Sequence, residues 1–181
     1  MSNFNYSIDA AGHSNIPDIK GREFNKPVAI CVGEIKDLYK WGQVTISQEL
    51  LSELLPGPVT LCFKRLPSLN CELNPTSELV GIRIPDHEFI REVCRETKCA
   101  LALTSANVSN AQSALNIQEF QDLFPKLSCI FDGGTLSLTE NSRKGSTIID
   151  LSEVGNFSII RPGSAEIQTV EKLEKFGLVQ K

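Results

Sequence analysis

A short polar stretch follows one of the apolar runs of this chain. The segment LALTSANVSN, residues 101–110, begins with apolar residues and then carries small hydroxyl and amide side chains, among them Ser105 and Asn107. In open α/β sheets, ligands bind outside the ends of strands, where such donors and acceptors are available. The same residue types also cap backbone groups in a turn between a strand and a helix. Spacing alone favours the capping turn over the ligand site.

A hydrolytic role for Ser105 is disfavoured. A nucleophilic serine needs a base within hydrogen-bonding distance, and that base is most often a histidine. The chain has 2 histidines, His13 and His87, and lacks a G-x-S-x-G motif. We therefore set aside a serine hydrolase.

A group of cations precedes the first apolar strand pattern. The segment KGREFNKP contains Lys20, Arg22 and Lys26. In an extended segment, Lys20 and Arg22 project to the same side, since alternate residues share a face. An ammonium group beside a planar guanidinium suits a phosphate or a carboxylate. A solvated basic turn has the same composition, so both interpretations stay open.

Three further arginines lie at or near the ends of predicted strands. Arg83 interrupts the apolar alternation of VGIRIP and must point away from its isoleucines. A mid-sheet arginine needs an anion, which is either a ligand carboxylate or an acidic residue of the protein. Arg143 precedes Gly145 and Ser146 in NSRKGST, and Arg161 ends a strand in RPG. Guanidinium groups, hydroxyls and backbone amides together predict a ligand that bears phosphate.

The absence of known phosphate motifs limits how that ligand is held. The chain contains neither G-x-x-x-x-G-K-[ST] nor G-x-G-x-x-G. A P-loop and a Rossmann turn are therefore excluded.

Composition predicts one cytoplasmic domain. The chain has 181 residues, of which 41% are hydrophobic, which is enough for a single core. The net charge of -4 argues against a surface that coats nucleic acid. The 6 cysteines form no C-x-x-C pair, so we expect free, mostly buried thiols and no zinc site. We find neither a signal peptide pattern nor an apolar run of the roughly 20 residues that span a bilayer.

Strand and helix patterns alternate along the chain. Two junctions resemble hairpins, which favours a mixed sheet. Ser47 is expected to cap one helix, and Asn116 with Glu119 to form a capping box for another. Strands are predicted at residues 26–33, 58–65, 79–86, 99–104, 127–134, 146–152 and 156–163, and helices at residues 34–42, 47–57, 86–98, 117–124 and 167–176.

Several motifs resemble those of the YrdC-like family. They are KGREFNKPVAI, LLPGPVTL, VGIRIPDH, ALTSANVS, FDGG, GSTIIDL and IIRPG, and they occur in the family's order. Overall the chain resembles the animal YrdC domain-containing proteins of this family. The resemblance implies a single α/β domain with a twisted mixed sheet, flanking helices and a positively charged concave groove. We place this domain at residues 19–178, after an unmatched and poorly ordered segment 1–18 and before a tail at 179–181.

The resemblance also implies an activity. Members of the family are nucleotidyltransferases that form L-threonylcarbamoyl-AMP and pyrophosphate from L-threonine, bicarbonate and ATP, with Mg²⁺ as the expected divalent ion. A threonylcarbamoyl transferase complex then modifies adenosine 37 of tRNA. The family is associated with double-stranded RNA binding and allows a mitochondrial form beside the cytoplasmic one.

Roles for individual residues follow from the matching motifs. The resemblance implies catalytic roles for Lys20, Arg22, Ser105 and Asn107. It implies ATP contacts for Arg22, Lys26, Ser105, Ser113, Arg143 and Arg161, and threonine contacts for Arg83, Leu103 and Ser146. It implies no protein ligand for a metal. With these motifs around it, the stretch at 101–110 is reinterpreted as a strand that delivers Ser105 and Asn107 to the nucleotide.

One family motif is not found in this chain. The pattern P-T-D-T-x-Y-G-L, which helps to bind threonine, is replaced by MSNFNYSIDAAGHSNIPDI. We therefore expect an N-terminally incomplete or alternatively spliced domain. The competing hypothesis is a catalytically impaired isoform or paralogue that acts as a nucleotide-binding or double-stranded-RNA-binding module.

Overall fold

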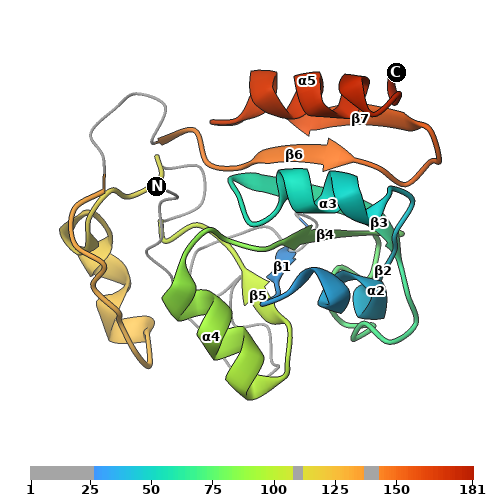
Figure 1. The fold of residues 1–181 in the computed structure, drawn as a ribbon. Helices are drawn as coiled ribbons and strands as arrows, with labels where there is room; N and C mark the ends of the chain where they lie inside the picture. The colour runs from blue at the N-terminus through green and yellow to red at the C-terminus, as the bar shows by residue number, and fades with distance from the viewer. Residues whose placement is uncertain (1–26, 108–111, 137–142) are drawn as a thin grey trace.

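The computed structural model describes residues 27–107, 112–136 and 143–181 (Figure 1). Over these residues the strands form one sheet in the order β5-β1-β4-β3-β6-β7-β8, with β2 paired to β3. Pairs β1–β4, β3–β6 and β7–β8 are parallel and the others antiparallel, which confirms the mixed sheet. The strands are β1 (Ala29–Cys31), β2 (Gly42–Gln43), β3 (Val59–Arg65), β4 (Leu79–Arg83), β5 (Leu101–Leu103), β6 (Thr147–Asp150), β7 (Asn156–Arg161) and β8 (Val179–Gln180).

Helices cover both faces of the sheet. They are η1 (Ile35–Asp37), α2 (Leu38–Trp41), α3 (Gln48–Leu54), α4 (Glu88–Thr97), η2 (Ile117–Lys126) and α5 (Glu166–Lys175). The predicted cap of α3 is confirmed, because Ser47 Oγ accepts a hydrogen bond from Leu50 N at 3.2 Å. The expected cap of η2 is confirmed in its first half, since Asn116 Oδ1 accepts from Glu119 N at 3.2 Å, while Glu119 Oε2 accepts from Leu115 N at 3.4 Å instead of from Asn116 N. Among the described residues, no helix is both long and apolar enough to span a membrane.

The two faces of the central strands differ in kind, because successive side chains of a strand alternate between faces. One face, here called the core face, packs large apolar side chains against α2, α3 and α5. The other, here called the small-residue face, is defined by Ala29, Cys31, Thr60, Cys62, Gly81 and Arg83. The core face contributes Ile30, Leu61, Phe63, Val80, Ile82 and Ile149 to the main hydrophobic core.

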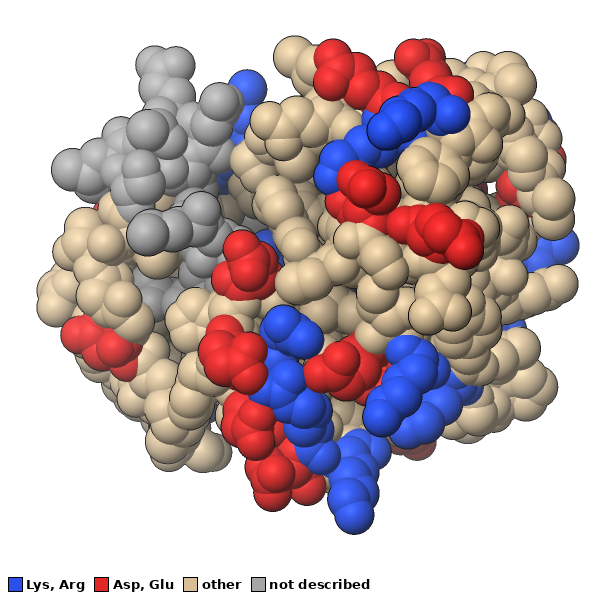
Figure 2. Space-filling view, viewed as in Figure 1, with Lys and Arg blue, Asp and Glu red and all other residues tan. Residues whose placement is uncertain are grey.

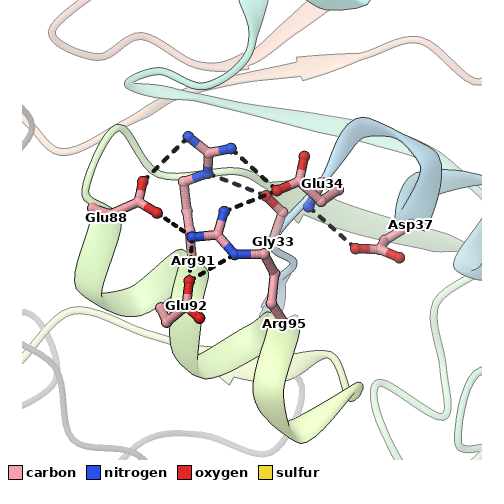
Figure 3. A network of polar contacts seen from close by, with 7 residues as sticks. All are labelled: Gly33, Glu34, Asp37, Glu88, Arg91, Glu92 and Arg95. Atoms are coloured by element: carbon pink, nitrogen blue, oxygen red, sulfur yellow. Dashed lines mark hydrogen bonds and ion pairs between the residues drawn. The ribbon is translucent and has the colours of Figure 1, made fainter.

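Helix α4 covers the small-residue face only at its β1–β5 end. There Ile90 and Cys94 form a small buried cluster with Cys31 and Leu101. A network of charged side chains fixes α4 to the loop after β1 (Figure 3). Arg95 Nη1 lies 2.9 Å from Glu34 Oε1, and Arg91 Nε donates to the Gly33 carbonyl at 3.1 Å.

The loop at residues 66–78 is held by Arg65, which precedes it, and by a contact of Asn74 with Val28. Arg65 donates to backbone carbonyls of this loop, at 2.8 Å to Asn70 and 2.7 Å to Leu73. Asn74 pairs its side-chain amide with the backbone of Val28, accepting from its N–H at 2.7 Å and donating to its C=O at 2.8 Å. The loop therefore extends the hydrogen bonding at the start of β1.

Three expectations from the sequence need correction. Residues 127–134 form no strand, and Cys129 and Phe131 are exposed, so their apolar character does not reflect a place in the sheet. The helix expected at 117–124 is a 3₁₀ segment that continues to Lys126, with non-helical backbone at Phe120. The cysteines are free, but only three of them are buried; Cys71, Cys99 and Cys129 are exposed.

The end of the chain belongs to the sheet. Val179–Gln180 form β8 beside β7, and Lys181 N donates to the Phe157 carbonyl at 2.9 Å. Residues 179–181, which the sequence suggested to be a tail, are therefore hydrogen-bonded to the domain. The segment 1–18 lies outside the described residues.

Candidate functional site

Two of the predicted site residues meet where β6 begins and β7 ends. Arg161 Nη2 donates to the Ser146 carbonyl at 2.7 Å and to Ser146 Oγ at 3.3 Å. The next residue, Thr147, donates its N–H to the Pro58 carbonyl at 3.1 Å, which joins β6 to the start of β3. The backbone of Ser146 is therefore fixed from both sides.

Two glycines make this approach of the two segments possible. A Cβ atom on Gly163 would lie 2.3 Å from Thr147 N and 2.4 Å from the Ser146 carbonyl carbon, so no side chain fits there. Gly145 has a φ of 69°, and a Cβ atom on it would lie 3.3 Å from Arg161 Nη2. The motifs RPG and KGST thus carry glycine for a close backbone approach and a left-handed turn respectively.

Thr60 completes the cluster, although the sequence analysis did not select it. Its Oγ1 lies 2.9 Å from Ser146 Oγ, and both residues are buried. The name "Ser146 cluster" is used below for Thr60, Ser146 and Arg161. The signal available in the sequence was a threonine at a position of VTLCF that alternates with apolar core residues.

Arg83 lies close to this cluster along the sheet. It is buried on the small-residue face, as expected from its alternation with Ile82 and Ile84. Its Nε donates to the Gly57 carbonyl at 3.4 Å. The carbonyl of the next residue, Pro58, accepts the hydrogen bond from Thr147 N. Arg83 and Thr147, the residue after Ser146, thus bind the carbonyls of two adjacent residues, Gly57 and Pro58, in the segment that enters β3.

The thiols near Arg83 are not activated nucleophiles. Cys31 is level with Arg83 in the sheet, and its Sγ lies 3.7 Å from Cys94 Sγ. The hydrogen bond to Cys94 and burial raise the pKa of the Cys31 thiol, against the opposing effect of the Arg83 guanidinium. Burial, and then the charge of Asp150, raises the pKa of Cys62 to about 12. Both thiols are protonated near neutral pH.

Arg143 lies in a second cluster, together with Ser113. Its Nη1 donates to the Ser113 carbonyl at 2.9 Å and to Glu119 Oε2 at 2.7 Å, while Nη2 donates to Glu119 Oε1 at 3.2 Å. This bidentate pair holds the pKa of the Glu119 carboxyl below its usual value. The charge of Arg143 is therefore balanced within the protein.

Ser105 and Asn107 follow β5 in a tight turn. Asn107 N donates to the Ser105 carbonyl at 3.0 Å; Ser105 is exposed and Asn107 is buried. Strand β5 is antiparallel to β1. Cys31 of β1 pairs with Arg83 of β4 on one side and with Leu101, the first residue of β5, on the other. Leu103 pairs with Ala29 and packs at the edge of the α4 cluster. In register, the carboxyl end of β5 therefore lies at the amino end of β1.

The remaining predicted contacts, Lys20, Arg22 and Lys26, lie outside the described residues. Within the described ranges, no group of three or more His, Cys, Asp or Glu side chains is placed to hold a metal ion. The face shown in Figure 2 carries lysines and arginines interspersed with acidic side chains, not one continuous basic patch.

Comparisons with known proteins agree with the motif order. The family model Sua5_yciO_yrdC, described as "Telomere recombination", matches residues 9–163. Threonylcarbamoyl-AMP synthase of Bos taurus is 48% identical over 163 residues, which cover 89% of this chain and 59% of that protein. The Homo sapiens protein of the same name is 48% identical over 164 residues, with the same coverage. The chain therefore spans somewhat more than half the length of these relatives.

Solved structures share the fold. A crystal structure of Pyrococcus abyssi Sua5 complexed with L-threonine superposes with a TM-score of 0.82 at 24% identity, covering 98% of this chain and 53% of that one. Escherichia coli YciO superposes with a TM-score of 0.74 at 18% identity, covering 91% of this chain and 80% of that one. These similarities establish the architecture.

Proposed function

Because this chain belongs to the Sua5/YciO/YrdC family, we propose that it forms L-threonylcarbamoyl-AMP and pyrophosphate from L-threonine, bicarbonate and ATP. The observation that carries the proposal is the 48% identity with the bovine threonylcarbamoyl-AMP synthase over 89% of this chain. The Ser146 cluster supports it, since it offers a fixed hydroxyl and a guanidinium where two strand ends meet.

The proposed mechanism rests on positioning and on charge. The threonine amine attacks the carbon of bicarbonate, a C–N bond forms, water leaves and a carbamate results. A carbamate oxygen then attacks the α-phosphorus of ATP, the bond to the β-phosphate oxygen breaks, and pyrophosphate leaves. Bringing the reactants together lowers the entropic part of the barrier, and cationic side chains stabilise the charge on the leaving group.

We assign roles on the same basis. Arg83, Leu103 and Ser146 contact threonine in this proposal. ATP is bound by Arg22, Lys26, Ser105, Ser113, Arg143 and Arg161, with Lys20 and Asn107 acting beside them in a positively charged groove. Arg143 would exchange part of its pairing with Glu119 for a phosphate. Mg²⁺ would enter bound to the phosphates of ATP, since the described residues supply no group of three or more His, Cys, Asp or Glu side chains to hold it.

The product is an activated acyl adenylate, and a second enzyme must consume it. We propose that a threonylcarbamoyl transferase complex moves the threonylcarbamoyl group to adenosine 37 of tRNA. Because the carbamate of threonine is the group that displaces pyrophosphate, purified chain given ATP without threonine should release little pyrophosphate.

The assay that tests the proposal measures two products. Purified chain is incubated with ATP, L-threonine and bicarbonate, pyrophosphate release is followed, and threonylcarbamoyl-AMP is identified by mass spectrometry. Ser146→Ala should raise the KM for threonine by about three- to tenfold, the effect of losing one hydrogen bond. The control is Ser152→Ala, since Ser152 lies just beyond the opposite end of β6. Folded protein that binds ATP but releases no pyrophosphate would show a binding module instead of an enzyme.

A further inference from the structure

Thr60 contacts the candidate site only through another side chain. Only 2% of Thr60 is exposed to solvent, and its Oγ1 lies 2.9 Å from Ser146 Oγ. A residue so deeply buried is not available to contact a ligand directly. Whatever effect Thr60 has on a ligand must therefore pass through Ser146.

The backbone around Ser146 is already fixed without Thr60. Arg161 holds the Ser146 carbonyl at 2.7 Å, and Thr147 is bound to the Pro58 carbonyl at 3.1 Å. These backbone bonds do not set the rotation of the Ser146 side chain about χ1, which depends on the partners of its Oγ: Arg161 Nη2 at 3.3 Å and, at the shorter distance of 2.9 Å, Thr60 Oγ1. A serine side chain has three staggered orientations, and a hydrogen-bond partner selects among them.

Thr60 is itself held in one orientation. A β-branched side chain is restricted at χ1. Its Cγ2 would lie 3.1 Å from a Cβ atom at Gly81, so it occupies the space that the glycine leaves on the small-residue face. With Cγ2 placed there, Oγ1 points to Ser146.

Counting the hydrogen-bonding positions of Ser146 Oγ shows what is left for a ligand. A serine hydroxyl offers one proton and two lone pairs. Arg161 donates to one lone pair, and Thr60 occupies either the other lone pair or the proton. In both cases one position is left, and its direction is set by the protein.

We propose that Thr60 is a positioning residue that orients the Ser146 hydroxyl toward L-threonine. This inference rests on the proposed function for the identity of the ligand. The orientation of Ser146 itself rests only on the geometry of Thr60, Gly81 and Arg161.

The test compares Thr60→Val with Thr60→Ser. Valine keeps the shape and removes the hydroxyl, whereas serine keeps the hydroxyl and removes Cγ2. Proton J couplings of Ser146, measured by NMR, report its χ1. We expect one χ1 rotamer in the wild type and in Thr60→Ser, and an average over rotamers in Thr60→Val.

Kinetics supply the second readout. In Thr60→Val the KM for threonine should rise about three- to tenfold, corresponding to one lost hydrogen bond. The KM for ATP should change by less than about twofold, because the ATP contacts are not altered. Thr60→Ser should restore the threonine KM to near the wild-type value.

The outcomes separate the two proposals. An unchanged Ser146 rotamer in folded Thr60→Val overturns the positioning role, whatever the activity. Equal threonine and ATP effects would also overturn it, since they indicate a general structural defect. Averaged rotamers in Thr60→Val beside a wild-type chain that releases no pyrophosphate would support the geometry and overturn the proposed function.

Discussion

The core face and the small-residue face are built from alternate residues of the same strands. In β3, Leu61 and Phe63 are fully buried in the main core, while Thr60 and Cys62 lie on the other side. Large side chains on one face fill space, and small ones on the other leave the backbone and short polar groups close to the surface of the sheet. One sequence pattern therefore supplies stability on one face and a place for chemistry on the other.

The largest expected effect is on stability: a truncation on the core face should destabilise the protein more than one on the small-residue face. Leu61→Ala should lower the free energy of unfolding by about 2–5 kcal/mol, because it leaves a cavity in the main core. Cys62→Ala, one residue along on the small-residue face, should lower it by about 1 kcal/mol. Chemical denaturation of both variants measures the difference, and equal losses would contradict the distinction between the faces.

The next effect concerns the close approach beside Ser146. Gly163→Ala should lower the free energy of unfolding by about 1–3 kcal/mol or more, because its Cβ would overlap backbone atoms of Ser146 and Thr147. The control is Gly155→Ala, where nothing lies within 4 Å of the added Cβ and the φ of 77° alone causes strain. That control should lose about 1 kcal/mol and keep its affinity for threonine. A smaller loss for Gly163→Ala than for Gly155→Ala would contradict the steric argument.

A smaller effect is expected on the small-residue face itself. Gly81→Ala should cost about 1 kcal/mol, since its Cβ would lie 3.1 Å from Thr60 Cγ2. Thr60→Ser removes Cγ2 and should recover part of that loss in the double variant. A double-mutant cycle by thermal denaturation measures the coupling. Strict additivity of the two substitutions would show that Gly81 does not set the position of Thr60.

The smallest effect belongs to the charged network on α4 and depends on pH. Arg95, with Arg91, holds the pKa of Glu34 below its usual 4.5. The ionised carboxylate therefore stabilises the fold above pH 4.5, and this contribution is lost as the pH falls through the lower pKa of the folded state. Because the pair is partly exposed, Glu34→Gln should cost less than about 1 kcal/mol at neutral pH.

The measurement is denaturation of wild type and Glu34→Gln between neutral and acidic pH. The stability difference should disappear at the acidic end. Glu174→Gln on α5, outside the network, is the control and should show no such change. A Glu34→Gln difference that persists in acid would indicate that packing, not charge, explains its effect.

The features of the fold that depend on local sequence patterns were the ones that could be predicted. Six of the seven predicted strands, the Ser47 cap and the Asn116 cap depend on local patterns, and they are confirmed, whereas the short strands β2 and β8 were not predicted. The strand predicted at 127–134 was wrong: Phe131 packs on Phe89 of α4 at a ring-centroid distance of 4.8 Å and takes no part in the sheet. A segment whose apolar side chains pack on an exposed aromatic residue has the same composition as a buried strand.

The candidate site was predictable only in part. Ser146 and Arg161 were both selected from their motifs, and the structure brings them together. Thr60 was missed because its partner is 86 positions away, and the Arg143–Glu119 pair because it joins residues 24 positions apart. The antiparallel direction of β5, which sets where Ser105 lies, follows from the pairing of whole strands and not from the local sequence.

The loop at 66–78 has a consequence for how this protein tolerates change. Asn74 supplies with its side chain two hydrogen bonds to the backbone of Val28, and Arg65 binds the carbonyls of Asn70 and Leu73, which precede Asn74 in the loop. Its length is therefore set as rigidly as that of a strand. Over evolution such a loop can exchange its exposed residues, such as Glu72, but an inserted residue would move Asn74 away from β1.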